Sequence, residues 1–258
     1  MGEHRSESGA WPRPATYGGL ERPSPDAAGR QGVPAPRPAP AVLPVALRGW
    51  LGLVAALAAL VVGGLGVGYA GDGEPGGADA RSWVAAEDGS PWRSLALATD
   101  FWGEPVGAAT LVAVVVAGCL LLRRPRAVVF VVAGTGLPVG VTMLLKPLVG
   151  RTIHDGSLSY PSGHTAFLTA LALAVALLVA GRLDLGRAAG ASLTFTVALV
   201  AGAAMAWAQV ALDAHYPTDT LGGWCTALAV VPATGWLVDR TADRATRRLV
   251  NSPDAKHH

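Results

Sequence analysis

Long uncharged stretches alternate with short polar segments along most of this chain. Six stretches of 17 to 25 residues contain no acidic, basic or histidine side chain. About 20 such residues cross the roughly 30 Å hydrocarbon layer of a bilayer as a helix. Soluble helices carry a polar stripe, which "LVAVVVAGCLLL" and "LALAVALLVAG" lack. The pattern favours membrane-spanning helices over a soluble helical bundle, with spans within 49–71, 105–122, 127–145, 165–181, 188–212 and 220–238.

Composition supports this assignment and sets the domain limits. Hydrophobic residues make up 51% of the 258 positions and charged residues only 15%, whereas soluble domains carry about a quarter. We therefore predict an all-α fold, a six-helix transmembrane bundle over 43–240. Residues 1–42 are rich in Pro, Gly, Arg and Ser and predict a disordered cytoplasmic arm. Residues 241–258 are expected to form a cytoplasmic tail.

Charge asymmetry predicts the orientation of the spans. The loop "RRPR" at 123–126 carries only positive charge, and basic residues also concentrate in both terminal segments. Segment 71–104 instead holds seven acids and two arginines. Because basic loops remain cytoplasmic, we expect a multi-pass cell-membrane protein with both termini inside and 71–104 outside.

Segment 71–104 is too polar to span a membrane and too long to be a simple turn. It contains Trp83, Trp92 and Trp102, and indole rings favour the headgroup layer. We expect an interfacial helix or a folded lid on the outer side.

Ionisable residues collect at the outer ends of the predicted spans. They are costly at a membrane boundary unless they are solvated or used, so they predict a site. The collected residues are Lys146, Arg151, His154, Asp155, Ser162, His164, Asp213, His215 and Asp219.

Two short motifs predict anion chemistry. In "PSGHT", Ser162 and Gly163 precede a helix whose free N–H groups suit an oxyanion, with His164 beside it. In "HYPTD", His215 and Asp219 are four residues apart and share a helical face. A carboxylate on one ring nitrogen leaves the other free as nucleophile or base. Each motif alone is weak, since a capped helix start and a local hydrogen-bonded pair are common.

Lys146 and Arg151 add cationic donors that suit phosphate. Cations, a helix N-terminus, one free histidine and one Asp-supported histidine together indicate phosphate-ester cleavage through a phosphohistidine. A metal site built from the histidines and acids of this set is disfavoured, because Lys146 and Arg151 would repel a cation and the spacing matches no common ligand set.

Together these residues resemble the type 2 phosphatidic acid phosphatase superfamily over roughly 41–240. The family pattern is K-x6-R-P, then P-S-G-H, then S-R-x5-H-x3-D. Lys146, "PSGH" at 161–164, and the pair His215 and Asp219 match it in order. The resemblance implies that His215 attacks phosphorus, Asp219 orients it, and His164 protonates the leaving oxygen and later activates water. It also implies that the Lys, the Arg and the Ser-Gly backbone hold phosphate, and that no metal is needed.

The chain departs from the family pattern at two arginines. The first-motif Arg-Pro falls on Ile153-His154, and the third-motif Ser-Arg falls on Ala208-Gln209. We expect Arg151 to replace the first arginine and Gln209 to contribute an uncharged hydrogen bond. Phosphate binding should be weaker as a result.

The sequence therefore predicts a membrane lipid phosphatase that acts on a polyprenyl or glycerolipid phosphate or diphosphate at the outer face. We expect the lipid substrate and the bilayer as partners, with no nucleic acid and no cofactor. A lipid phosphotransferase and a catalytically impaired lipid-phosphate-binding protein remain alternatives. The lipid and the oligomeric state stay open.

Overall fold

The computed structural model describes residues 1–2, 40–70, 79, 86–153 and 156–250. Met1–Arg37 and Pro38–His258 form two separate units, and the following account concerns the second. Most of the arm predicted to be disordered lies outside the described residues.

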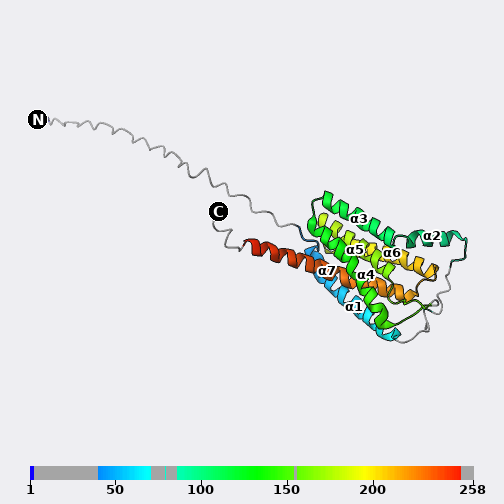
Figure 1. Cartoon of the computed structure of the whole chain (residues 1–258). Coiled ribbons are helices and arrows are strands. Elements are labelled where there is room, and N and C mark those ends of the chain that lie inside the picture. The colour runs from blue at the N-terminus through cyan, green and yellow to red at the C-terminus, as the bar shows by residue number, and fades with distance from the viewer. Residues whose placement is uncertain (3–39, 71–78, 80–85, 154–155, 251–258) are drawn as a thin grey trace. The chain divides into compact units, whose positions relative to one another are not determined.

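The described part of the second unit is all-α, as predicted (Figure 1). Five helices are long and apolar enough to cross a membrane. Two shorter helices, α2 (Pro91–Asp100) and α3 (Pro105–Leu121), meet at a bend of 58° and together form a sixth candidate span. A 3-10 turn at Val45–Leu47 precedes the first helix. The helices are α1 (Arg48–Tyr69), α2 (Pro91–Asp100), α3 (Pro105–Leu121), α4 (Pro125–Val149), α5 (Gly163–Arg182), α6 (Arg187–Ala211) and α7 (Pro217–Val250).

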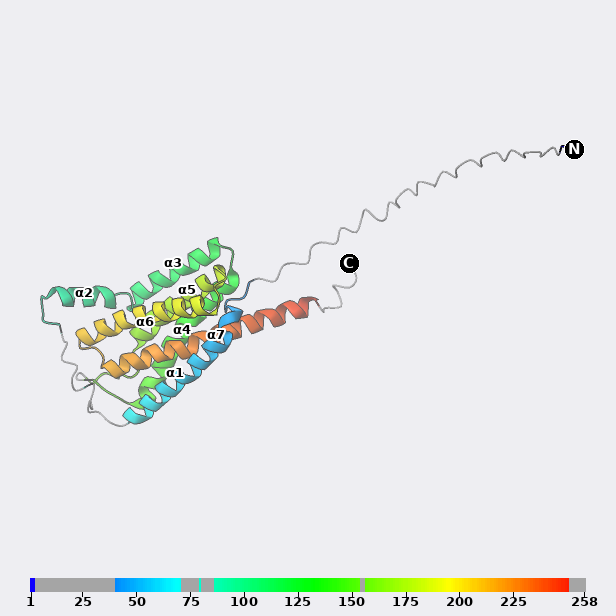
Figure 2. The ribbon, with the colours of Figure 1, turned by 180° about the vertical axis from the view of Figure 1, so that it is seen from behind.

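Helix α5 forms the core of the bundle. It contacts α3, α4, α6 and α7, and 61% of its most apolar 18-residue window is buried, against 17% for α1. Small residues such as Ala170 and Ala174, both 0% exposed, allow this close packing. Helix α1 lies on the outside of the bundle (Figure 2) and exposes large apolar side chains such as Leu53 and Leu60. Exposed leucines on an uncharged helix are expected where lipid is the solvent.

Local sequence signals set the helix ends. Helices α2, α3, α4 and α7 each begin with proline, whose fixed φ suits the first helical position. Helix α4 ends at Gly150, which has the left-handed φ of 70° that glycine adopts without strain. At the start of α5, the Ser162 side chain accepts a hydrogen bond from the Thr165 backbone N–H.

The starts of α5 and α7 are joined directly. The backbone N–H of Ser162 donates to the carbonyl of Asp219 at 2.9 Å. A Cβ at position 223 would clash with the carbonyl oxygen of Ser162, so Gly223 is required for this approach. The two helix starts that carry the histidine motifs are therefore held together by backbone contacts.

The segment expected to lie at the interface contains α2. This helix packs on the end of α6 through Ala96, Ala208 and Ala211, and the Ala86 N–H donates to the Ala211 carbonyl at 2.9 Å. Trp92 is 65% exposed, while Trp83 lies outside the described residues. Helix α7 continues to Val250, so the region predicted as a tail from 241 begins as helix.

Candidate active site

The alternating direction of the helices brings the predicted site residues to one end of the bundle (Figure 1). Lys146 lies in the last turn of α4 and Gln209 in the last turn of α6. Ser162, Gly163 and His164 start α5, and His215 and Asp219 flank the start of α7. His154 and Asp155 lie outside the described residues.

His215 and Asp219 form the predicted i, i+4 pair. The Nδ1 atom of His215 lies 3.7 Å from Oδ2 of Asp219, with the side chains 9% and 0% exposed. This oxygen also accepts the backbone N–H of Tyr216 at 3.1 Å. The carboxylate is thus fixed beside the ring, although 3.7 Å exceeds hydrogen-bond length. Catalytic contacts are often long without substrate.

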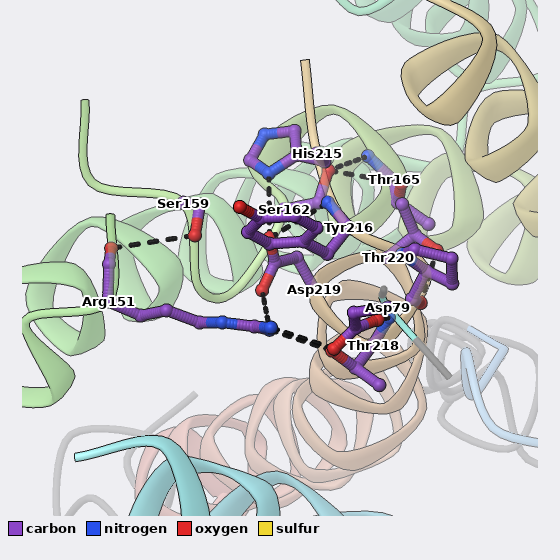
Figure 3. Close-up of polar contacts among 11 residues, drawn as sticks. Asp79, Arg151, Ser159, Ser162, Thr165, His215, Tyr216, Thr218, Asp219 and Thr220 are labelled. Atoms are coloured by element: carbon purple, nitrogen blue, oxygen red, sulfur yellow. Dashed lines mark hydrogen bonds and ion pairs between the residues drawn. The ribbon is translucent and has the colours of Figure 1, made fainter. Parts of the chain in front are cut away.

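Arg151 holds the other oxygen of Asp219 (Figure 3). Its Nη1 donates to Oδ1 of Asp219 at 2.7 Å, and its Nη2 donates to Oδ2 of Asp79 at 2.7 Å. Thr218 adds a second link between Arg151 and Asp79, because its hydroxyl accepts from Arg151 at 2.7 Å and donates to Asp79 at 2.7 Å. Asp219 therefore lies between a histidine and a buried arginine.

Two tyrosines enclose the Arg151 guanidinium. Its carbon lies 3.9 Å from the ring centre of Tyr69 and 4.5 Å from that of Tyr216. Burial opposes the charge, but the hydrogen bonds and negative charges of Asp79 and Asp219 outweigh it and raise the pKa of Arg151 above its usual value. The Arg151 side chain is 1% exposed.

This placement differs from the expected phosphate contact of Arg151. Both terminal nitrogens donate to carboxylates, and two aromatic rings lie against the guanidinium, so its charge is already paired with Asp79 and Asp219. Asp79 was not anticipated, because it is one of seven acids in segment 71–104 and no local motif marks it.

Ser162, Gly163 and His164 occupy the start of α5 as predicted. The Ser162 side chain is 0% exposed and its hydroxyl lies 3.1 Å from that of Thr165. His164 is more open, with 29% of its side chain exposed. Its Nε2 lies 3.5 Å from Glu104 and 3.7 Å from Asp100.

The corner between α2 and α3 supplies these two acids. Gly103 lies in this corner, and a Cβ there would clash with the His164 ring. The bend of 58° thus brings the corner directly against the histidine. Asp100 and Glu104 are functional candidates that sequence reasoning did not single out.

Gln209 faces the same corner. Its Nε2 donates to Oδ1 of Asp100, and the residue is 2% exposed. Its backbone carbonyl accepts the N–H of Ala214 at 2.9 Å and that of His215 at 3.4 Å. Where the family pattern has an arginine, this chain has an amide held by an acid, and its backbone shapes the turn that leads to His215.

Lys146, in the last turn of α4, is partly buried. Its charge interacts with that of Asp219, so this lysine lies near the His215–Asp219 pair.

Asp100, Glu104 and His164 place ligand atoms within 4.8 Å of one another, a geometry that could hold a metal ion. This set differs from the metal set considered from sequence, sharing only His164. Exposed acids cluster commonly without an ion, and no second feature of the described residues indicates a ligand here.

Comparison with known proteins supports the motif resemblance. The sequence pattern of the PAP2 superfamily matches residues 127–242. A crystal structure of a transmembrane PAP2 type phosphatidylglycerolphosphate phosphatase from Bacillus subtilis is similar, with 20% identity and a TM-score of 0.51. The alignment covers 78% of this chain and 96% of that one, so the two share a fold. No match was found among curated protein sequences.

Proposed function

We propose that this chain, which belongs to the PAP2 superfamily through residues 127–242, is an integral membrane lipid phosphatase with a histidine nucleophile. The observation that carries the proposal is the His215–Asp219 pair, with its Nδ1–Oδ2 distance of 3.7 Å. It lies at the same end of the bundle as His164 and Lys146. Each of these residues matches the family motif in kind and in order.

His215 is the proposed nucleophile. Because Asp219 faces Nδ1, Nε2 is the nitrogen left to attack phosphorus. A phosphorus–nitrogen bond forms as the bond to the lipid oxygen breaks, and His164 gives that oxygen its proton. His164 then takes a proton from water, whose oxygen attacks the phosphohistidine. Inorganic phosphate leaves and His215 is regenerated.

The start of α5 and Lys146 are proposed to hold the phosphate. The backbone N–H groups of Gly163 and His164 suit phosphate oxygens, since a helix N-terminus carries partial positive charge, whereas the Ser162 N–H is bonded to the Asp219 carbonyl. Lys146 contributes a point charge. The side chain of Gln209 is bonded to Asp100. Its contribution is therefore its backbone carbonyl, which shapes the turn leading to His215.

Arg151 is proposed as a positioning residue. It fixes one oxygen of Asp219 at 2.7 Å, which leaves the second oxygen directed at His215. Asp79 balances the charge of Arg151, so the pair adds little positive potential for substrate. Removing one partner of a buried ion pair costs about 3–5 kcal/mol, which gives the arrangement its rigidity.

The phosphate site is therefore poor in positive charge. Asp100 and Glu104 add negative charge beside His164, where the family pattern would supply an arginine. Phosphate and substrate should bind weakly compared with a site that has both family arginines.

The proposed substrate is a lipid phosphate or diphosphate, of polyprenyl or glycerolipid type, reached from the outer face. The outer placement rests on the basic loop at 123–126 and the acidic segment 71–104. Cysteines introduced at 86–90 should react with an impermeant thiol reagent in intact cells, and cysteines at 123–126 should not. The reverse labelling would move the site to the cytoplasm.

Phosphate release from a panel of lipid phosphates, with and without EDTA, tests the activity itself. We expect release that EDTA leaves unchanged and that His215→Ala abolishes. Activity that requires an added metal would contradict the mechanism. Binding of lipid phosphates without any release would identify a binding protein instead.

A further inference from the structure

The end of the bundle opposite the catalytic residues marks the second membrane boundary. Helix α7 has 34 residues, a length of about 51 Å, and so extends beyond a hydrocarbon layer of about 30 Å. Its uncharged stretch ends at Asp239, and that of α1 begins after Arg48. Nη2 of Arg48 lies 3.4 Å from Oδ2 of Asp239. The two helices therefore meet the headgroup layer at this ion pair.

A cationic cavity of about 340 Å³ opens at this boundary. Its two acids are engaged: Asp239 accepts the backbone N–H groups of Val42 and Leu43 at 2.8 and 3.2 Å, and Asp243 pairs with Arg126 at 3.2 Å. Among the described residues, no carboxylate pairs with the other three arginines of the cavity. The lining residues are Arg48, Trp236, Asp239, Arg240, Asp243, Arg244 and Arg247.

An apolar cavity of about 490 Å³ adjoins the first one. Both are lined by Arg48 and Trp236, and Arg240 stacks on the Trp236 ring at 4.7 Å. The apolar cavity follows α1 past Gly49, Gly52 and Ala55 toward the membrane interior, where α7 contributes Pro232 and Ala233. The space beside Gly49 and Gly52 is open, since a Cβ at either position would meet no atom within 4 Å.

We propose that these two cavities bind one anionic glycerophospholipid, separate from the substrate. Its phosphate lies among Arg240, Arg244 and Arg247, and one acyl chain lies in the apolar cavity between α1 and α7. Arginine matches phosphate oxygens with paired donors, and the size of the cationic cavity is typical of a small-ligand site.

The joined cavities favour a lipid over other anions. Free phosphate would use only the cationic cavity, and a soluble acidic ligand would leave the apolar cavity facing acyl chains. About 20 residues of α7 separate this site from Asp219, a distance of about 30 Å. The site therefore does not share the proposed catalytic residues, and its test does not depend on turnover.

Lipid binding to the purified full-length protein tests the proposal. Detergent-solubilised protein is titrated with phosphatidylglycerol or phosphatidylcholine, and bound lipid is counted by native mass spectrometry. Basic residues near anionic headgroups strengthen binding to them. We therefore expect Arg240→Gln, Arg244→Gln and Arg247→Gln combined to weaken phosphatidylglycerol binding at least about tenfold, with phosphatidylcholine unchanged.

The matched control removes three arginines from the other loops at the same end. Arg123→Gln, Arg124→Gln and Arg182→Gln combined should leave the preference for phosphatidylglycerol intact. An equal loss in both triple variants would mean general surface attraction and would overturn the site. Inorganic phosphate that displaces the lipid at equal concentration would also overturn it, because the apolar cavity would then contribute nothing.

Gly52→Phe tests the acyl-chain half without changing charge. The new ring has open space at its Cβ and should fill the apolar cavity. We expect it to weaken phosphatidylglycerol binding several-fold, while an unchanged elution volume in size-exclusion chromatography confirms an intact fold. Unchanged binding in this variant would contradict the proposed position of the chain.

Discussion

The two histidines of the candidate site stand in contrasting surroundings. His215 is 9% exposed and faces Asp219, which is itself fixed by Arg151 and the Tyr216 backbone. His164 is 29% exposed and faces Asp100 and Glu104, the latter with 52% of its side chain exposed. The His215 ring therefore faces a buried ion-pair network, and the His164 ring lies partly exposed at the corner between α2 and α3.

This contrast matches the division of labour proposed for the reaction. A nucleophile must keep one ring orientation through attack and release, and a fixed carboxylate provides that. A general acid and base must exchange protons with both substrate and water, which requires access to solvent. The His164 ring is the more exposed of the two, although its Nε2 atom is buried, and we therefore propose it for the proton-transfer role.

The largest effect should follow from changing the buried pair. His215→Ala should abolish turnover, and Asp219→Asn should lower kcat by several orders of magnitude, because an amide favours the wrong ring tautomer. Rapid quenching of wild-type protein with labelled substrate should trap acid-labile phosphate on His215. Near-wild-type activity in His215→Ala would exclude the proposed mechanism.

Changing the open histidine should have a smaller effect that depends on the substrate. His164→Ala should cost about 10²–10⁴-fold with alkyl phosphates, and less with diphosphates or nitrophenyl phosphate, whose leaving groups need no proton. Initial rates on both substrate kinds check this. An equal loss on both would remove His164 from acid catalysis.

Arg151 separates positioning from phosphate contact. Arg151→Gln should lower kcat by about 10²-fold, because Asp219 is then free to move away from His215 and a small misplacement of a catalytic group is costly, while the affinity for inorganic phosphate stays nearly unchanged. Asp79→Asn, which keeps the Arg151–Asp219 contact, should lose less activity. If Arg151→Gln instead weakened phosphate binding and left kcat intact, Arg151 would be a substrate ligand, as the motif first suggested.

Gly103 tests how closely the α2–α3 corner must approach His164. Gly103→Ala introduces a Cβ less than 3.0 Å from the His164 ring, so the ring or the corner must shift substantially. We expect a loss of about tenfold in kcat with alkyl phosphates, since small displacements of a catalytic group are costly. Gly118→Ala in α3, where a Cβ meets nothing within 4 Å, is the matched control and should behave as wild type.

The smallest effect concerns the missing family arginine. Gln209→Arg alone should change phosphate affinity little, because Asp100 already binds this side chain and would pair with the new charge. Gln209→Arg combined with Asp100→Asn should tighten phosphate binding about fivefold, the difference between a charged and a neutral hydrogen bond. Isothermal titration with phosphate measures both. Strong tightening by the single change would show that Asp100 does not control this position.

The six spans and the His215–Asp219 pair could be predicted because both depend on short-range chemistry. Hydrocarbon thickness fixes the length of an uncharged stretch wherever it occurs, and i, i+4 residues share a helical face in any context. Ser162 likewise indicated the start of α5, and Pro217 that of α7.

The tertiary structure decided which polar and charged side chains pair with one another. Arg151 binds Asp79 and Asp219, and Gln209 binds Asp100, across segments far apart in sequence. The sequence pointed to Arg151 and Gln209 but not to their partners, because the seven acids of 71–104 carry no local signal that separates one from another. A buried charge must find a partner, and which partner it finds depends on how distant helix ends meet.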